Sequence, residues 1–203
     1  IDKTEADDII AYLGSIIPEK PEDKIIIVSS DKDFLQLVNE NVLVYRPIEK
    51  EYYNEDTIKE KFNISPHNFI IYKTLLGDSS DKVKGIKGLG EKGLYKKFPE
   101  ITEKDLTLDD IHSICESKFK DHLVYARVIQ NIEELEKNYK IMDLSNPMLT
   151  DRDKEQLKTF VLSEKTHYLP EQFLAMYKKD QLGSIIRNVE YWIGDVFSRF
   201  EQK

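Results

Sequence analysis

Residues 24–33 read Lys24-Ile25-Ile26-Ile27-Val28-Ser29-Ser30-Asp31-Lys32-Asp33. The unbroken β-branched run predicts a strand over 24–29 that is buried on both faces, as in a parallel sheet. A short helix is expected over 34–38, and Val42-Leu43-Val44-Tyr45 predicts the next strand. This β-α-β order is typical of an α/β sheet.

An amphipathic helix is predicted over residues 4–17, with Thr4 as its cap and Asp7 three positions later. Tyr52-Tyr53 predicts a short strand or turn, and a helical pattern continues through residues 58–76. Beyond Pro99 the pattern is helical throughout. Helices are expected over 108–117, 119–138, 151–163, 170–178 and 184–200, with a capping box at Thr150 and Asp153 and a linker over 143–150.

The composition is that of a globular protein, with 203 residues, 40% hydrophobic and 33% charged. No apolar run approaches the ~20 residues that cross a membrane, and the start has no signal-peptide pattern. We therefore expect a cytoplasmic protein. The single cysteine, Cys115, excludes an intramolecular disulfide and a cysteine-based zinc site, and its helical setting predicts a buried side chain.

Seven carboxylates form three short clusters in the first 81 residues. They are Glu5, Asp7 and Asp8, then Asp31 and Asp33, and finally Asp78 and Asp81. Taken singly, each has an ordinary explanation as a helix cap, a favourable first-turn charge or a turn residue. All three in this order, next to a glycine-rich stretch, favour a shared function.

That function is predicted to be divalent-metal binding. Asp31 and Asp33 follow the first strand directly, at the edge where open sheets bind ligands. Glu5 and Asp8 share one helix face, and Asp78 and Asp81 have the same spacing. Two Mg²⁺ ions, or Mn²⁺ in their place, suit such oxygen ligands, and ions ~3.5–4 Å apart can promote phosphodiester displacement.

The stretch after Asp81 predicts contact with a phosphate backbone. Four of the eight glycines lie at 85, 88, 90 and 93, which marks a tight hairpin between two helices. Residues 82–97 hold six lysines and one glutamate, although the chain has a net charge of −8. The predicted nucleic-acid-binding residues are Lys82, Lys84, Gly85, Lys87, Gly88, Gly90 and Lys92.

These motifs resemble the 5′-nuclease (flap endonuclease) superfamily. The matching stretches are Glu5-Ala6-Asp7-Asp8, residues 29–37, and residues 76–90 from Leu76-Gly77-Asp78 to Gly90. The match is dense over the first hundred residues. The helical tail is more similar to the phage enzyme called ribonuclease H.

The resemblance implies a fold and a division of the chain. It implies the C-terminal part of a parallel-sheet, PIN-like core, followed by a helix–three-turn–helix and an all-helical region. Residues 1–76 would form a partial catalytic core, and residues 77–203 a nucleic-acid-binding region with the helix–three-turn–helix at about 77–98. The family's first strands and helical arch are not found before Glu5, so we expect the chain to be the later part of a longer protein.

The resemblance also implies an activity. A structure-specific, metal-dependent 5′-3′ exonuclease and flap endonuclease with ribonuclease H activity would remove RNA primers and 5′ flaps during replication. Glu5, Asp7, Asp8 and Asp31 would serve the first metal, and Asp33, Asp78 and Asp81 the second. The glycine hairpin would also hold K⁺. Substrates would be flapped, nicked or forked duplex DNA and RNA/DNA hybrid, bound by a monomer.

Two alternatives stay open at this stage. The chain could be a non-catalytic duplex-DNA-binding module, although seven carboxylates would repel DNA without metal. The aromatic C-terminal face, with Tyr191, Trp192, Val196, Phe197 and Phe200, is predicted to be core, the alternative being a docking site for a single-stranded-DNA-binding protein or clamp.

No general base stands out, so metal-bound hydroxide is the expected nucleophile, with Tyr12, Tyr72 and Lys73 as weaker candidates to approach the phosphate.

Overall fold

The computed structural model describes residues 4–18, 20–80, 82–163, 169–183 and 185–198. Its contacts divide the chain into two compact units, Ile1–Lys158 and Thr159–Lys203. Over the described residues, no helix combines the length and the apolar character that crossing a bilayer requires. The predicted functional division at residues 76 and 77 is a separate matter and stays a prediction.

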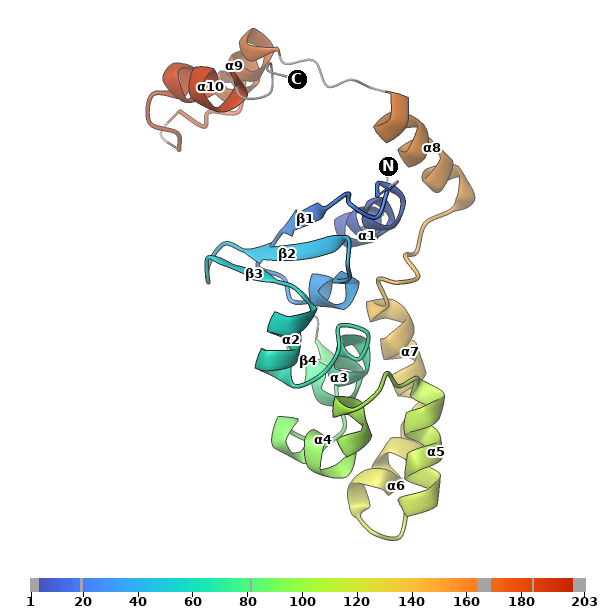
Figure 1. Ribbon diagram of the computed structural model, residues 1–203. Helices are drawn as coiled ribbons and strands as arrows, with labels where there is room; N and C mark the ends of the chain where they lie inside the picture. The colour runs from blue at the N-terminus through green and yellow to red at the C-terminus, as the bar shows by residue number, and fades with distance from the viewer. Residues whose placement is uncertain (1–3, 19, 81, 164–168, 184, 199–203) are drawn as a thin grey trace. The chain divides into compact units, whose positions relative to one another are not determined.

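The first unit contains a small mixed sheet. Its strands are β1 (Ile25–Val28), β2 (Val42–Arg46) and β3 (Glu51–Tyr53), in the order β1-β2-β3 (Figure 1). β1 and β2 are parallel, with Ile25 opposite Val42, and β3 runs antiparallel to β2. The prediction of an α/β fold is confirmed at this level.

Burial on both faces of β1 was predicted, and this is wrong. Ile27 points into the core, but Ile26 is 48% exposed and Val28 is 65% exposed. Among the described residues, β1 pairs only with β2, and its second face has no covering layer. Apolar composition indicates that a face can be buried, but it does not supply the element that buries it.

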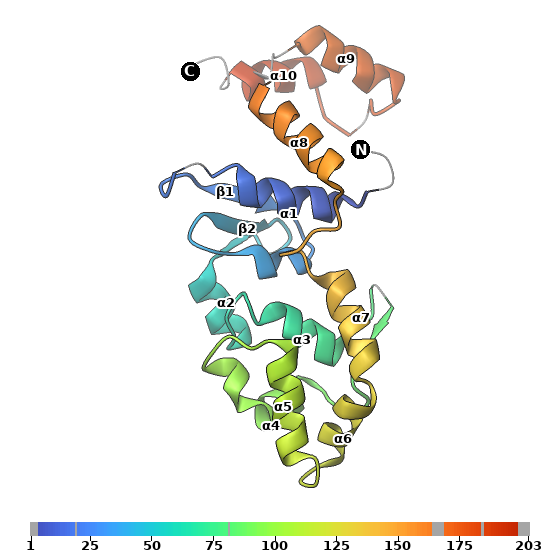
Figure 2. The ribbon, with the colours of Figure 1, turned by 90° about the vertical axis from the view of Figure 1, so that its right-hand side faces the viewer.

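Helix α1 (Ala6–Ile16) lies beside the sheet, and Ala11 contributes to the core (Figure 2). Thr4 was expected to cap it, which is wrong, because Glu5 takes the N-cap position and makes no side-chain capping bond. The short helix expected after β1 is a 3-10 helix, η1 (Asp33–Leu37), which buries Phe34 and Leu35.

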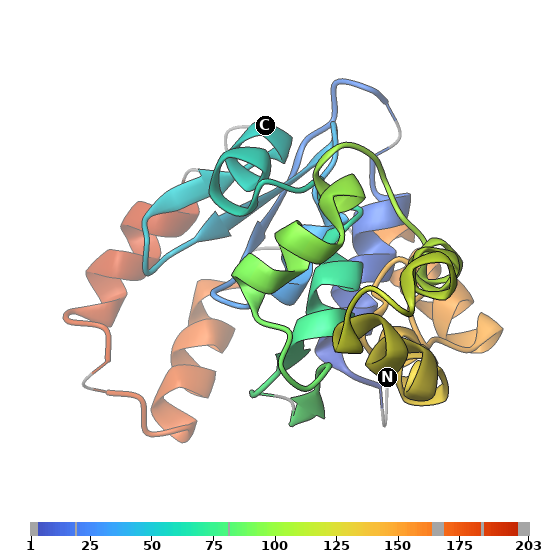
Figure 3. The ribbon, with the colours of Figure 1, turned by 90° about the horizontal axis from the view of Figure 1, so that it is seen from below.

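The rest of the first unit is mainly helical. In chain order its elements are α2 (Glu55–Phe62), α3 (Phe69–Leu76), β4 (Gly77–Asp78), β5 (Val83–Lys84), α4 (Glu91–Lys97), η2 (Pro99–Thr102), α5 (Leu108–Lys118), α6 (Leu123–Gln130) and α7 (Ile132–Met142). The boundary between the two units falls within α8 (Asp151–Ser163). Helix α3 contacts both α4 and α7 (Figure 3), and Phe69, Ile71 and Leu75 on it are fully buried.

A single helix over 119–138 was expected, and this is wrong. His122 caps the start of α6 by accepting a hydrogen bond from Val124 N at 3.2 Å. Asn131 then leaves the helical conformation and separates α6 from α7. The predicted capping box at the start of α8 is confirmed, because Thr150 and Asp153 exchange side-chain-to-backbone bonds of 3.2 Å in both directions.

Two amide side chains, the half-buried Gln36 and the buried Asn68, tie distant segments together. Gln36 donates to Met142 O and accepts from Leu144 N, both at 3.0 Å. Asn68 donates to Ile101 O at 2.8 Å and accepts from Leu106 N at 2.8 Å. The predicted linker over 143–150 is therefore held against η1 at its start.

The second unit has a small core of its own between α9 (Pro170–Lys179) and α10 (Val189–Phe197). Trp192 stacks on Phe173 with ring centroids 5.9 Å apart, as predicted for a core residue. Tyr191 is 73% exposed, so its assignment to the core is wrong. The Phe197 side chain and Phe200 lie outside the described residues. The last helix begins later than expected because Asn188 adopts a left-handed conformation and caps α10.

Candidate metal centre and nucleic-acid interface

The turn after β1 is held by its own side chains. Asp31 N donates to Ser29 Oγ at 3.0 Å, and Asp33 N donates to Asp31 Oδ1 at 2.9 Å. The Asp31 carboxylate therefore caps the backbone at the start of η1, which was one of the explanations left open by the sequence. Its second oxygen is not used in this bond.

A buried lysine connects the second and third acidic clusters. Lys73 on α3 has a side chain only 7% exposed, and its ammonium forms ion pairs with both Asp33 and Asp78. The contact with Asp78 Oδ2 is 2.6 Å. Asp33 and Asp78 are therefore brought together around one positive charge, although 45 positions separate them in the chain.

The pKa of Asp78 reflects this environment. Burial raises the pKa of the carboxyl group, but hydrogen bonds from Lys73 and Ser80 outweigh burial and hold it well below its usual range. Ser80 contributes both its backbone N–H, at 2.7 Å, and its hydroxyl. Asp78 is thus held as a carboxylate, which is the form that binds cations.

Three aspartates line one cavity of about 530 Å³ at the carboxyl end of β1 and β2. They are Asp31, Asp33 and Asp78, together with Ser30, Ser80, Lys32 and Arg46. This is the edge of the sheet at which ligand sites form in open α/β folds. The structure therefore brings three of the seven predicted carboxylates to a common surface.

Arg46 at the end of β2 was not predicted from the sequence. Arg46 is 6% exposed. Its Nη2 atom donates a hydrogen bond to Ser30 O at 2.9 Å and forms an ion pair with Glu49 at 3.0 Å. The guanidinium lies 5.5 Å from the centre of the Tyr53 ring. Arg46 thereby fixes the loop that carries the aspartates.

The first acidic cluster does not line this cavity. Glu5 is the N-cap of α1, and Asp7 and Asp8 lie in its first turn. Asp8 Oδ1 accepts a hydrogen bond from Met148 N at 2.9 Å. Asp81 lies outside the described residues.

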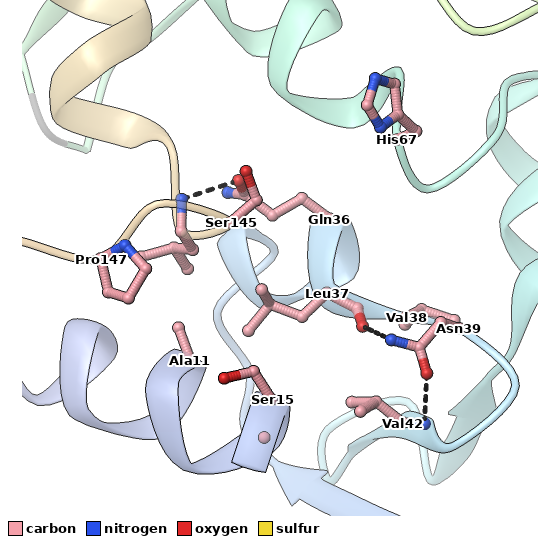
Figure 4. Close-up of a pocket in the computed structure, with 12 residues that line it drawn as sticks. Ala11, Ser15, Gln36, Leu37, Val38, Asn39, Val42, His67, Ser145 and Pro147 are labelled. Carbon is pink, nitrogen blue, oxygen red and sulfur yellow. Dashed lines mark hydrogen bonds between the residues drawn. The ribbon is translucent and has the colours of Figure 1, made fainter. Parts of the chain in front are cut away.

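A second cavity, of about 380 Å³, lies where α1 ends and β2 begins (Figure 4). Figure 4 shows Ala11, Ser15 and Gln36 around it, with Ser145 and Pro147 closing one side. Its lining contains no aspartate or glutamate among the residues described.

The aspartate cavity fits a divalent cation in its donor chemistry. Mg²⁺ is commonly held by one or two carboxylates and several waters, and Asp33 and Asp78 already share one cation, the Lys73 ammonium. No three histidine, cysteine, aspartate or glutamate side chains converge on one point in the described part of the chain. A metal ion here would rely on water or substrate for its remaining ligands.

The glycine-rich stretch forms an exposed turn beside this cavity. β4 and β5 pair antiparallel, and the chain then turns through residues 85–90 into α4. The side chains of Lys82, Lys84, Lys87 and Lys92 are all exposed. Gly88 has a φ of +82°, which only glycine adopts readily.

Gly85 has a structural reason to be glycine. A Cβ atom at this position would lie 2.1 Å from the Leu76 carbonyl carbon. The turn is therefore packed directly against the end of α3. The exposed lysines lie on and around this turn. Gly90, in contrast, has open space where its Cβ would lie.

Comparisons with known proteins find relatives among 5′-3′ exonucleases. Residues 1–63 match the family described as 5′-3′ exonuclease, N-terminal resolvase-like domain. A 5′-3′ exonuclease of Aquifex aeolicus is 36% identical over 154 residues, which covers 76% of this chain and 50% of the relative. DNA polymerase I of Bacillus subtilis is 33% identical over 127 residues, covering 61% of this chain and 14% of the relative.

The fold has solved counterparts. A flap endonuclease of bacteriophage T5, in a pseudo-enzyme-product complex with DNA and metal ions, superposes with a TM-score of 0.66. The superposition covers 80% of this chain and 60% of that one, with 22% identity. The chain spans half the length of the Aquifex relative. The resemblance predicted from the acidic clusters is confirmed by these matches.

Proposed function

Because sequence and fold relate this chain to the 5′-nuclease superfamily, we propose that it is the nuclease part of a structure-specific enzyme that hydrolyses phosphodiester bonds at 5′ ends and flaps. One observation carries the proposal. Asp31, Asp33 and Asp78 line one cavity, and the exposed lysine turn begins a few residues beyond Asp78.

We assign cation binding to the aspartate cavity. Asp31, Asp33 and Asp78 would hold divalent cations, with Mg²⁺ as the first candidate and two ions as the expected number. Glu5, Asp7, Asp8 and Asp81 are proposed as further ligands or as carboxylates that act through water. Bound cations of this kind activate water and stabilise charge on a phosphate.

The protein's own residues prepare the site in three ways. Lys73 keeps Asp33 and Asp78 close together by offsetting their mutual repulsion. Arg46 fixes the loop that carries Asp31 and Asp33. Ser80 donates to one oxygen of Asp78 and so orients the other toward Lys73.

The lysine turn would hold the substrate. Lys82, Lys84, Lys87 and Lys92 are proposed to contact the phosphate backbone of a duplex, and Gly85, Gly88 and Gly90 to let the backbone approach it. Such contacts position the duplex without reading its sequence. A K⁺ ion bound by carbonyl oxygens of this turn is part of the same proposal.

The relatives suggest the substrates and the cellular role. A 5′-3′ exonuclease and a DNA polymerase I are among them. On that basis our proposal extends to primer and flap removal in replication, including cleavage of RNA in a hybrid. We propose a cytoplasmic site of action.

A second candidate function is duplex binding without catalysis. Lys73 already offsets part of the negative charge of Asp33 and Asp78, and no three metal-binding side chains converge within the described ranges. A non-catalytic protein of this kind would bind duplex DNA through the lysine turn alone.

Cleavage of a 5′-labelled flap duplex distinguishes the two functions. The nuclease proposal expects cutting near the junction with Mg²⁺, no cutting with EDTA, and loss of cutting in Asp31→Asn. Asp56→Asn, an exposed aspartate on α2, serves as the matched control and should cut normally. Salt-sensitive duplex binding without any Mg²⁺-dependent cutting would support the binding module instead.

A further inference from the structure

A side chain of α6 forms a hydrogen bond with the turn that carries Lys87. Arg127 Nη1 donates to the Lys87 carbonyl oxygen at 2.6 Å, across 40 residues of sequence. From α7, Asn138 Nδ2 donates to Lys84 O at 3.2 Å. Two side chains of the helical region thus bind carbonyl groups on either side of Gly85 and Ile86.

We propose that Arg127 is a positioning residue for nucleic-acid binding. Through the Lys87 carbonyl, it fixes the conformation of the turn and so the direction in which the Lys87 side chain leaves it. This inference rests on the proposed duplex-binding role of the turn. It assigns a function to α6, which the comparisons leave without one.

Gly88 and Arg127 are matched in shape. A Cβ atom on Gly88 would lie 2.9 Å from Arg127 Nη1, closer than such contacts normally come. The positive φ of Gly88 turns the chain under the guanidinium, and the missing side chain leaves room for it. A side chain at position 88 would therefore require the Arg127 guanidinium to shift.

The surroundings of Arg127 are suited to holding a turn. A cavity of about 460 Å³ beside it is lined by Lys84, Lys87, Arg127, Asn131 and Glu134. Three of these residues are cationic and one is anionic. Arg127 holds the Lys87 carbonyl oxygen through a charged donor, and such a hydrogen bond is stronger than a neutral one.

Arginine suits this task better than lysine. Its planar fork presents several N–H donors in a fixed geometry, and less side-chain freedom is lost for each bond formed. One nitrogen of Arg127 is committed to the turn, which argues against a direct contact through that atom with a phosphate.

Duplex binding in EDTA, measured over a series of salt concentrations, tests the proposal. We expect Arg127→Gln to weaken binding about tenfold, since one charge-assisted bond is lost. The slope of log affinity against log salt should stay unchanged, because no phosphate contact disappears. Arg127→Lys should recover part of the affinity. Arg152→Gln, an exposed arginine on α8, removes the same charge and should bind as the wild type does.

A double-mutant cycle with Lys87→Ala provides the decisive readout. Lys87→Ala removes the side chain but keeps the carbonyl, so Arg127→Gln should cost much less in that background. Additive losses would overturn the proposal. A salt slope lower by about one would overturn it too, because it would make Arg127 itself a phosphate contact.

The outcomes separate this inference from the proposed function. If the wild-type chain bound no duplex, both would fall. If the wild-type chain bound duplex, and both Arg127→Gln and Arg127→Lys bound it as tightly as the wild type does, the inference alone would fall. Melting temperatures of all variants show whether a loss of binding reflects unfolding.

Discussion

Lys73 Nζ lies 2.6 Å from Asp78 Oδ2, and both groups are largely withdrawn from solvent. The same ammonium pairs with Asp33. A lysine inside an apolar helix therefore supplies the positive charge around which two acidic clusters meet. Removing one partner of a buried ion pair leaves the other partners uncompensated, and that is costly.

Lys73→Met is expected to lower the free energy of unfolding by about 3 kcal/mol. Asp33 and Asp78 would then face each other without a cation. Lys61→Met is the matched control, because Lys61 pairs with Glu51 on the exposed surface, where such a pair contributes less than about 1 kcal/mol. Urea unfolding of the two variants gives the comparison, and equal losses would contradict the role of Lys73.

Divalent cations are expected to raise the melting temperature of Lys73→Met more than that of the wild type. The substitution removes a competing charge from between two carboxylates, so Ca²⁺ or Mg²⁺ can take its place. Thermal melts with added cation and with EDTA measure the effect. An identical shift in both proteins would mean that Asp33 and Asp78 do not bind the cation together.

Gly85→Ala and Gly90→Ala are expected to differ in stability. The Gly85→Ala methyl group would collide with the Leu76 carbonyl, so the turn must move and stability should fall by more than about 2 kcal/mol. Gly90→Ala has open space and should leave the melting temperature nearly unchanged. Denaturant unfolding of both variants decides whether the turn packs as described.

Asn68→Ala is expected to cost about 2–4 kcal/mol of stability. Its amide joins the start of α3 to the chain after η2 through bonds to Ile101 O, Lys104 O and Leu106 N. The substitution leaves buried backbone groups without partners. Asn39→Ala is a less buried comparison and should cost less, so unfolding midpoints in the reverse order would refute this assignment.

Cys115 is expected to make stability depend on alkaline pH. Burial raises the pKa of the thiol to about 12. Above the ordinary thiol pKa of about 8.5, the unfolded chain loses this proton and the folded chain keeps it, so the free energy of unfolding falls as pH rises. Cys115→Ala should show a shallower alkaline decline than the wild type.

Alkylation of the thiol provides an independent measurement of the same property. The native protein should react with iodoacetamide slowly near neutral pH, and the urea-unfolded protein rapidly. Fast reaction of the native chain would show that Cys115 is not buried.

The sequence predicted the main elements where local patterns are strong. The apolar runs at residues 25–28 and 42–45 located both strands, and Thr150 with Asp153 located the start of α8. It could not predict that Ile26 and Val28 are exposed, because a strand's composition does not state what covers it. The break at Asn131 was missed because the helical pattern continues on both sides.

The candidate site was predictable only in part. Asp31 and Asp33 follow a predicted strand, and the structure places them on one cavity with Asp78. Lys73 had a usable signal, since it is the only charged residue between Phe69 and Leu76. Arg127 had none, because its partner is a backbone carbonyl 40 residues away and no side-chain pattern marks such a bond.

The bonds between Gln36 and the chain at Met142 and Leu144 have a consequence for biosynthesis. Met142 and Leu144 lie 106 and 108 positions after Gln36 in the chain. The segment that follows Leu144 closes one side of the cavity beside α1. Contacts of such long range are slow to form, because they carry the entropy cost of closing a long loop. During translation, the sheet region therefore cannot reach its final packing until residue 144 has emerged from the ribosome.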